Sequence, residues 1–349
     1  MDMSQPAFEA RHVDSLPSVT VCAPGRLHLG FFDPAGTLGR SFGSLGLVID
    51  GFETEVSLAA AAESRVTAAG VAERAESERA RDYLDRLQQH SGRYQPLHLT
   101  LRRVLPAHAG FGSGTQLALA IARAFAAWHG LDVATPVLAQ WLGRGARSGI
   151  GIAGFDHGGL LVDGGPGSAI ATGATNTLAP LLARLPLPDA WRVLVIQHKT
   201  ERGLSGDDER RAIATLAPLP QALAADICHQ VLMRVLPGAA SAEFAPFAAG
   251  INRIQDVLGE HFAPAQGGSR YTSAAVGRLM QWIAAAGHGA AVGQSSWGPT
   301  GFAILPSQAE AEAVLAAARA DRVIAVDLTL NIVAGRNRGA TLIDSRHAR

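Results

Sequence analysis

The amino-acid sequence predicts an α+β protein that is built from two domains. Its 349 residues exceed the usual size of a single domain, so two domains are the expected number. Segments with the alternation of a half-buried strand stand between segments with the 3.6-residue period of a helix. The stretch 164–187 is rich in Gly, Ala, Thr and Pro and is the natural boundary. We therefore expect one domain over 18–175 and a second over 190–345.

The composition favours a globular protein without a nucleic-acid or membrane partner. Hydrophobic residues make up 48% of the chain and charged residues 17%, which is enough apolar material for sizeable cores. The formal net charge is zero, so no basic field favours nucleic acid or an anionic membrane. The chain has no apolar run of about 18 residues, and its first fifteen residues lack the apolar core of a signal peptide. Cys22 and Cys228 offer neither metal-ligand spacing nor a disulfide framework. We expect a cytoplasmic protein.

The strands and helices of the first half follow from these periods. Arg26, His28 and Gly30 alternate with apolar residues, which places the polar set on one face of a strand. The segment 73–91 has apolar residues at helical spacing, and its charged side chains should form a solvated face. The predicted strands are 19–23, 26–32, 45–50, 53–60 and 97–104, with a turn at Pro24-Gly25. The predicted helices are 73–91 and 136–142, the second with Thr135 as its N-cap.

A glycine-rich loop runs into an apolar helix within the stretch Leu105–Trp128. Small residues let the backbone approach a ligand closely, and the free N–H groups at the start of the helix face that ligand. The positive end of the helix dipole lies behind them, so we predict a phosphate site; a plain glycine loop before a buried helix is the alternative. The loop is not a Walker motif, because no lysine follows its last glycine. The candidate phosphate-binding residues are Gly110, Gly112, Ser113, Gly114, Thr115 and Gln116.

The second half begins with a predicted strand at 191–197 that ends in a polar loop. Lys199 in this loop is the only lysine among thirty basic residues, which suggests that its position needs a compact ammonium rather than a guanidinium. Chance placement is the alternative. Glu201 and Arg202 stand beside it, and polar loops at strand ends often bind ligands. We predict that Lys199 contacts a phosphate and that Glu201 and Arg202 belong to the same site.

The rest of the second half reads as a small α+β layer. An acidic run could bind a metal or, as we favour, cap a helix over 208–216; it consists of Asp207, Asp208 and Glu209. The further predicted helices lie near 220–236, 242–258, 273–286 and 308–320. The further predicted strands are 290–293, 300–305 and 322–327.

Three glycine motifs, in this order along the chain, resemble those of the GHMP kinase superfamily. They are CAPGRLHLG at 22–30, GFGSGTQLALA at 110–120 and GQSSWGPTGF at 293–302. The resemblance implies a ribosomal-protein-S5-like N-terminal domain and a ferredoxin-like C-terminal domain. It also implies that Arg26 and His28 lie at the active site, where we expect them to be catalytic; a solvated sheet face is the alternative. Ser296 and Gly298 are expected at the phosphate site.

Finer details resemble one branch of that superfamily, the β-ribofuranosylaminobenzene 5′-phosphate synthases of methanopterin biosynthesis. These details are RLHLGFFD at 26–33, GFGSGTQLALA at 110–120 and HKTERGLSG at 198–206. The resemblance implies that phosphoribosyl pyrophosphate is joined to 4-aminobenzoate or 4-hydroxybenzoate, with release of CO2 and pyrophosphate. Mg2+ is the expected cofactor, Lys199 is expected to face a phosphate or the leaving pyrophosphate, and a homodimer is left open. An ATP-dependent small-molecule kinase is the second hypothesis, and a non-catalytic phosphate-binding protein is the third.

One departure from the kinase pattern separates these hypotheses. Many GHMP kinases carry a Ser-Gly-x-Asp sequence whose carboxylate assists the hydroxyl that is phosphorylated, whereas Gly151 follows Ser148-Gly149-Ile150 here. The departure counts against phosphoryl transfer to an alcohol, and we predict that ATP is not a substrate. The nearest carboxylates are Asp156 and Asp163. We name Asp156 as the candidate displaced carboxylate, with a turn aspartate before a strand as the alternative.

Overall fold

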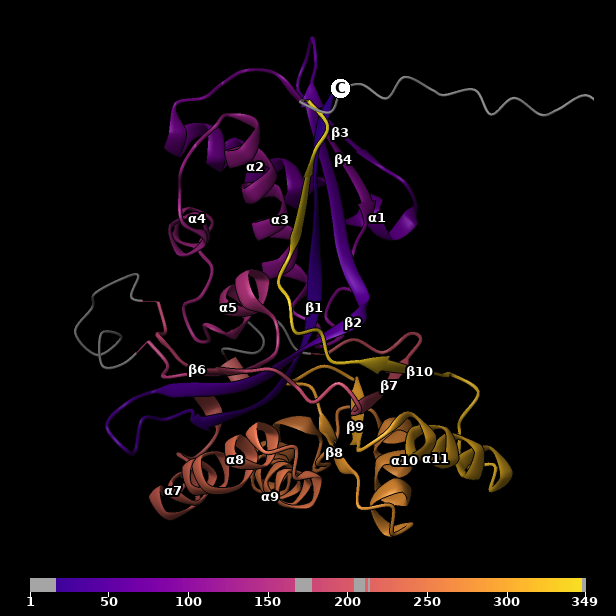
Figure 1. The fold of residues 1–349 in the computed structure, drawn as a ribbon. Helices are drawn as coiled ribbons and strands as arrows, with labels where there is room; N and C mark the ends of the chain where they lie inside the picture. Colours follow the sequence, from indigo (N-terminus) through magenta and orange to yellow (C-terminus); the bar gives the residue numbers. More distant parts are fainter. Residues whose placement is uncertain (1–16, 167–177, 204–210, 213, 347–349) are drawn as a thin grey trace, which may run out of the picture.

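The computed structural model describes residues 17–166, 178–203, 211–212 and 214–346 (Figure 1). The predicted acidic run at 207–209 lies outside these residues, as do residues 208–210 and 213 of the helix predicted over 208–216; residues 211, 212, 214 and 215 of that helix are helical. None of the helices in the described part of the chain has the length and apolar character that crossing a membrane requires.

A seven-stranded sheet forms the first half of the molecule. Its order is β11-β1-β2-β4-β3, while β5 pairs with β2 and β6 pairs with β5. The strands predicted at 19–23 and 26–32 form one long strand, and so do the strands predicted at 45–50 and 53–60. The turn predicted at Pro24-Gly25 is wrong, because a register shift between Pro24 and Arg26 absorbs the proline within the strand. The strands are β1 (Ser18–Asp33), β2 (Phe42–Ala60), β3 (Arg65–Ala68), β4 (Leu97–Arg103), β5 (Leu160–Asp163), β6 (Leu181–Leu185) and β11 (Thr341–Asp344).

Helices α2 to α5 cover one side of the long strands β1 and β2 (Figure 1). Leu119 and Phe125 of the central helix are fully buried against apolar residues of the sheet, so this helix is central, as its composition predicts. Thr135 is not an N-cap as predicted; Ala134 takes that position and Thr135 begins the helix. The helices are α1 (Val71–Ala75), α2 (Ser77–Ser91), α3 (Ser113–Trp128), α4 (Thr135–Trp141) and α5 (Ile150–His157).

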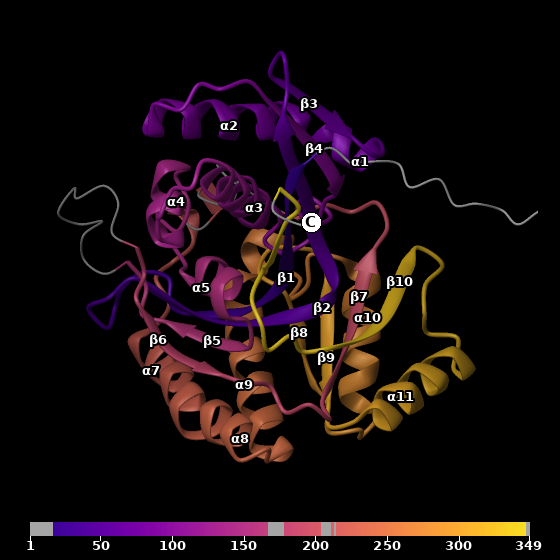
Figure 2. The same cartoon turned by 45° about the horizontal axis from the view of Figure 1, so that its top comes forward.

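The second half holds a four-stranded sheet and two groups of helices (Figure 2). Helices α10 and α11 pack on this sheet, and α7, α8 and α9 pack against the far part of the first sheet, with α9 also packed on β8 of the second sheet. The strand order is β10 (Leu328–Ala334), β7 (Arg192–His198), β9 (Gly301–Leu305) and β8 (Ala291–Gln294). The helices and turns are α7 (Gln221–Gln230), η2 (Val231–Val235), α8 (Leu236–Ala240), α9 (Phe244–Phe262), η3 (Ala263–Gln266), α10 (Ala274–Ala285) and α11 (Gln308–Ala320).

The end of the chain differs from the prediction. The strand predicted at 322–327 is not formed; the edge of β7 is instead taken by β10, whose Leu328 lies opposite His198. The chain then returns to the first sheet, where Val21 of β1 pairs with Leu342 of β11. Residues 341–344 of the predicted second domain therefore share a sheet with the first.

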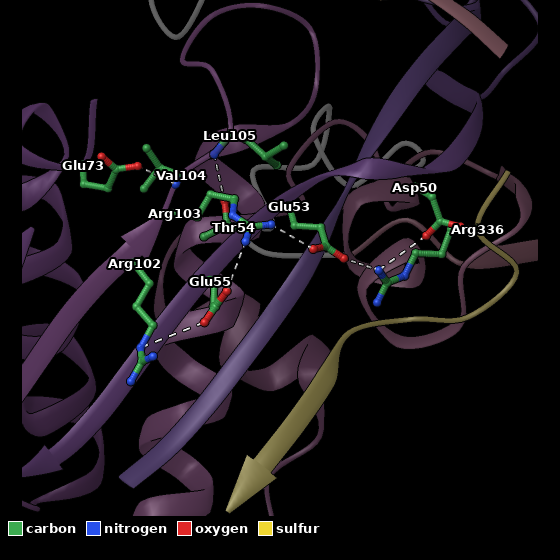
Figure 3. Close-up of polar contacts among 10 residues, drawn as sticks. All are labelled: Asp50, Glu53, Thr54, Glu55, Glu73, Arg102, Arg103, Val104, Leu105 and Arg336. Carbon is green, nitrogen blue, oxygen red and sulfur yellow. Dashed lines mark hydrogen bonds and ion pairs between the residues drawn. The ribbon is translucent and has the colours of Figure 1, made fainter. Parts of the chain in front are cut away.

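Arg336 fixes this returning segment to β2 (Figure 3). Its guanidinium is almost fully buried, forms an ion pair with Glu53 and lies 3.6 Å from an Asp50 carboxylate oxygen. It also donates to the Gly339 carbonyl at 3.0 Å. One buried cation thus joins the two ends of the chain in the first sheet.

Candidate active site

The glycine-rich loop turns into α3 as the sequence predicts. Gly110 and Gly112 have φ angles of +93° and +73°, in the left-handed region that favours glycine. Gly112 is the N-cap of α3 and supplies no side-chain cap, so the first N–H groups of the helix are open to a ligand. A Cβ atom on Gly112 would lie 2.5 Å from the Arg26 guanidinium, so the loop needs glycine to approach β1 this closely. The start of α3 is therefore an anion site with a cation beside it.

The other two glycine motifs meet this loop. Ser295 Oγ donates to the Gly110 carbonyl at 2.7 Å and accepts from the His28 backbone N–H at 2.9 Å. The Ser296 N–H donates to the His28 carbonyl at 3.1 Å. Gly298 packs so closely that a Cβ atom there would lie 2.5 Å from the Gly110 nitrogen. The expected convergence of motifs from both halves of the chain is confirmed.

The segment that leads into the loop is fixed by side chains of the first half (Figure 3). Thr54, which is fully buried, accepts from the Leu105 N–H at 3.2 Å. The Glu73 carboxylate accepts from the Val104 N–H at 3.3 Å. These contacts satisfy backbone groups that have left the strand ladder at the end of β4.

The three motifs enclose a cavity of about 490 Å³. Residues from both halves of the chain line it, among them Arg26, His28, Phe31, Arg79, His108, Gly110, Gly112, Ser113, Gly114, Thr115, Arg144, Arg147, Ser148, Ser296, Trp297 and Gly298. Four of these are arginines, and among the described lining residues none is Asp or Glu. The cavity is therefore built for an anion.

One end of the cavity, the arginine end, consists of Arg79 and Arg144 beside Gly114. Their guanidinium nitrogens lie 3.8 and 3.6 Å from where a Gly114 Cβ would stand. Arg144 lies over the Tyr83 ring, 5.3 Å from its centre, and donates to the Tyr83 hydroxyl. Burial and the charge of Arg79 lower the pKa of Arg144, although a guanidinium stays charged. Arg79 also pairs with Glu76 at 2.9 Å. An anion bound here would relieve the repulsion between the two cations.

The opposite end of the cavity, the aromatic end, consists of His28, Phe31 and Trp297 next to Gly110. The ring centres of His28 and Phe31 are 4.3 Å apart, and Trp297 directly precedes the glycine that touches Gly110. The glycine loop therefore runs from an aromatic surface at Gly110, past Arg26 at its middle, to the arginine end.

His28 is a buried neutral base at the aromatic end. Its side chain is only 3% exposed, and within the described part of the chain neither ring nitrogen has a hydrogen-bond partner. Burial, together with the charges of Arg26 and Arg147, lowers the pKa of His28 to about 3. The ring is therefore neutral at physiological pH and has one donor and one acceptor to offer to a ligand.

The start of α5 forms another wall, but its own N-terminus is closed. The buried Asp163 carboxylate accepts from the backbone N–H groups of Gly149 and Ile150 at 2.8 and 3.2 Å and from Ser148 Oγ at 3.0 Å. Burial raises the pKa of Asp163, and these hydrogen bonds oppose that rise. Asp163 thus holds Ser148 at the cavity and leaves α3 as the helix whose start is open to an anion.

The position where many GHMP kinases carry their carboxylate is occupied here by Gly151 and is tightly packed. A Cβ atom on Gly151 would lie 3.1 Å from the Thr115 methyl group, at the start of α3. Gln116 is fully buried and donates to the Gly151 carbonyl at 2.9 Å. Gln116 therefore joins α3 to α5 and does not line the cavity, contrary to the sequence-based expectation.

Three other predicted site residues lie elsewhere. Asp156 stands at the far end of α5, where its carboxylate accepts from Thr135 Oγ1 at 2.6 Å. Neither Glu201 nor Arg202 is among the described residues that line the cavity. Arg202 donates to the Ala107 carbonyl at 3.0 Å and so braces the glycine loop from outside.

Lys199 is also outside the cavity, contrary to the sequence-based expectation. Its ammonium donates to the Val326 carbonyl at 2.8 Å, and its backbone N–H donates to the Asp327 carbonyl at 2.9 Å. The polar loop follows β7 as predicted, but the pairing of β7 with β10 directs this lysine to the edge of the second sheet.

We expect Lys199→Met to keep turnover within about threefold of wild type and to leave the melting temperature nearly unchanged, because an exposed cation contributes little. Steady-state kinetics and a thermal melt measure this. A loss of turnover approaching a hundredfold would show that Lys199 acts in the active site.

The sequence reasoning misses several lining residues, among them the basic side chains of Arg79, His108, Arg144 and Arg147. Arg79 belongs to a helix face that reads as solvated, and only the packing of α2 beside α3 turns it toward the loop. The run GRGARSG at 143–149 carries the stronger signal, since two arginines stand among glycines in a short connection between helices. His108 has a positive φ of 58°, a strained backbone that the sequence does not reveal.

The described lining of the cavity has no carboxylate to hold Mg2+; its hard side-chain oxygens are hydroxyls, which belong to Ser113, Thr115, Ser148 and Ser296. Its charged lining residues are guanidinium groups, and the described part of the chain places no cluster of three His, Cys, Asp or Glu side chains for a metal ion. The acidic run at 207–209 lies outside the described residues.

Comparison with known proteins identifies the class first. A family model of the GHMP kinases N terminal domain matches residues 78–159, and one of the GHMP kinases C terminal domain matches 237–323. Homoserine kinase from Cytophaga hutchinsonii has a similar structure, with a TM-score of 0.65 at 17% identity over 97% of this chain and all of that chain. Mevalonate diphosphate decarboxylase from Enterococcus faecalis gives 0.65 at 15% identity over 95% of this chain and all of that chain. The predicted GHMP kinase-like fold is confirmed.

Curated relatives then give the family. Beta-ribofuranosylphenol 5′-phosphate synthase from Methanothermobacter thermautotrophicus is 31% identical over 92% of this chain and 97% of the relative. The protein of the same name from Archaeoglobus fulgidus is 32% identical over 82% of this chain and 87% of the relative. This chain belongs to the beta-ribofuranosylphenol 5′-phosphate synthase family, a branch of the GHMP superfamily.

Proposed function

We propose that this protein is a pentosyltransferase that joins phosphoribosyl pyrophosphate to 4-hydroxybenzoate, forming a C-riboside with release of CO2 and pyrophosphate, in methanopterin biosynthesis. The observation that carries the proposal is the cavity at the open start of α3, with four arginines and no acidic residue among its described lining. Such a site suits a substrate that bears phosphate groups at both ends. Family membership supports the same reaction.

The name of the relatives favours one of the two acceptors. Their name describes a ribosylated phenol, which 4-hydroxybenzoate yields and 4-aminobenzoate does not. Both acids carry a para substituent that donates electrons to the ring, so the chemistry is open to either. We propose 4-hydroxybenzoate as the preferred acceptor.

The bond changes of this reaction require that negative charge be stabilised at one position. The bond between ribose C1 and the pyrophosphate oxygen breaks, and its electron pair leaves with the pyrophosphate. The ring carbon that bears the carboxylate forms the new bond to C1. The bond to the carboxylate then breaks, its electron pair restores the aromatic ring, and CO2 departs. Negative charge therefore grows on the leaving pyrophosphate, where preorganised donors act most strongly.

The chain supplies those donors in a fixed arrangement. The start of α3 and the guanidinium of Arg26 face the same side of the loop at Gly112, and Arg144 and Arg79 stand beside Gly114. We propose that these groups hold the pyrophosphate and that Arg147 and Ser148 reach the rest of the substrate. Neutral His28 then hydrogen-bonds the reacting groups at the aromatic end.

The reaction is tested with carboxyl-labelled acceptors. Purified protein should release labelled CO2 from 4-hydroxybenzoate when phosphoribosyl pyrophosphate is present, and more slowly from 4-aminobenzoate. Parallel reactions with and without EDTA test the predicted need for Mg2+. Absence of CO2 release with both acids in Mg2+ would contradict the proposal, and phosphoryl transfer from ATP to small alcohols would favour the kinase hypothesis.

A further inference from the structure

A small recess opens behind the aromatic end of the cavity. Its volume is about 30 Å³, which is room for about two water molecules. It shares four wall residues with the main cavity, namely His28, Phe31, Ser296 and Trp297. The far wall comes from the end of α9, where Phe262 contacts Trp297 with ring centres 4.5 Å apart.

We propose that the aromatic acid lies at the aromatic end, against Phe31 and Trp297, and that Phe262 closes this subsite behind a single ring. The inference rests on the proposed function and adds where the acceptor binds and which residue limits its size. Phe262 is partly buried and lines the recess but not the main cavity. It is therefore a specificity-determining residue rather than a catalytic one.

The charges of the described walls favour this placement. The residues that the recess shares with the cavity carry no charge of their own, whereas the arginine end holds Arg79 and Arg144; Arg26 and Arg147 lie near enough to His28 to lower its pKa. Arg270 at the recess is neutralised by Asp256, at 2.9 Å, and by Glu260. The phosphates thus bind at the arginine end of the glycine loop, and the aromatic ring of the acceptor binds at the aromatic end.

The reaction requires that the acceptor subsite and the pyrophosphate subsite be adjacent. The attacking ring carbon must reach ribose C1, which carries the pyrophosphate, so the acceptor must lie next to the anion site. The glycine loop gives this continuity, because Gly110 stands at the aromatic end and Gly112 at Arg26. His28 lies where the cavity and recess join, nearly fully buried, with ring nitrogens that the described chain leaves to a substrate.

The recess is held rigid by its own hydrogen bonds. Gln255 accepts from the Gln294 N–H at 2.8 Å and donates to the Leu29 carbonyl at 2.6 Å. The Gln294 side chain donates to the Ser296 carbonyl at 2.9 Å, which fixes the loop before Trp297. These hydrogen bonds fix the loop that carries Trp297, the residue against which Phe262 packs.

Enlarging the recess tests the proposal as a gain of function. The acceptor 6-hydroxy-2-naphthoate keeps the conjugation between hydroxyl and carboxylate but adds a fused ring. We expect wild type to use it with a kcat/KM at least about 10-fold below that for 4-hydroxybenzoate. Phe262→Ala should raise kcat/KM for the naphthoate by about 10-fold or more and raise the KM for 4-hydroxybenzoate, while the KM for phosphoribosyl pyrophosphate stays within about twofold.

Phe244→Ala is the matched control. Phe244 is also a partly buried phenylalanine of α9 that contacts a tryptophan, Trp191, with ring centres 5.0 Å apart, but it lines neither cavity. It should leave the preference between the two acceptors unchanged. If Phe262→Ala does not fold, Phe262→Leu replaces it in the same experiment, because leucine enlarges the recess to a smaller extent.

The outcomes separate the inference from the reaction itself. Two results would overturn the acceptor subsite and leave the proposed pentosyltransferase reaction intact. In one, wild type uses both acceptors equally; in the other, a Phe262 variant turns over 4-hydroxybenzoate with an unaltered preference between the acceptors. Wild type that releases no CO2 from 4-hydroxybenzoate overturns the proposed function. Direct titration of the naphthoate, followed by its fluorescence, should show tighter binding to the Phe262 variant than to wild type.

Discussion

Arg144→Gln should lower kcat/KM for phosphoribosyl pyrophosphate by about 100- to 1000-fold, the effect of removing a preorganised donor from the leaving group. Arg144 faces Gly114 at the start of α3 and is held there by Tyr83. Glutamine keeps a polar side chain of similar reach but has no charge and no guanidinium fork. Steady-state kinetics with both substrates varied, together with a thermal melt, measure the result.

Arg86→Gln is the control for this experiment. Arg86 lies on α2, pairs with Asp82 at 3.3 Å and does not line the cavity. It removes one positive charge from the same region, so a general electrostatic effect would appear in both variants. We expect turnover near wild type for Arg86→Gln. Similar losses in the two variants would contradict a specific role for Arg144.

Arg336→Leu should lower the free energy of unfolding by about 2–4 kcal/mol. The variant leaves Glu53 without its buried cation (Figure 3). It also leaves the Gly339 carbonyl without its donor. Glu53 keeps a contact with Arg103 at 3.3 Å, which limits the loss. The midpoint of urea unfolding measures the change.

Arg338→Leu is the control for the stability experiment. Arg338 stands two residues further along the same segment, and its side chain is exposed. Surface substitutions of this kind usually change stability by less than about 0.5 kcal/mol. If both variants shifted the midpoint equally, the loss would come from the segment in general and not from the buried pair.

The position of the phosphate loop could be predicted because its causes are local. Glycines at 110 and 112 permit positive φ angles, and the apolar run that follows requires a buried helix. The meeting of the three motifs could be predicted from the resemblance alone, since each motif is a short segment whose relatives share one site. Arg26, His28, Ser296 and Gly298 line the cavity for that reason.

The residues that were misplaced depend on strand pairing and packing. Lys199 follows a strand, as predicted, but the partner of that strand sends its ammonium to Val326. Asp156 reads as a turn residue or a displaced carboxylate, and only the formation of α5 places it at the helix end away from the cavity. Arg79 reads as solvated until α2 packs beside α3.

The sequence by itself determined the family, the order of the motifs, the open helix start and the presence of glycine at 151 in place of a kinase carboxylate. These features reside in a few neighbouring residues, so local conformational preference is enough to fix them. The tertiary structure decided which charges face the cavity, how Asp163 closes the start of α5, and how Phe262 and Trp297 bound the recess. These contacts join residues far apart in the chain, and their direction is set by the packing of helices on two sheets, which no local pattern encodes.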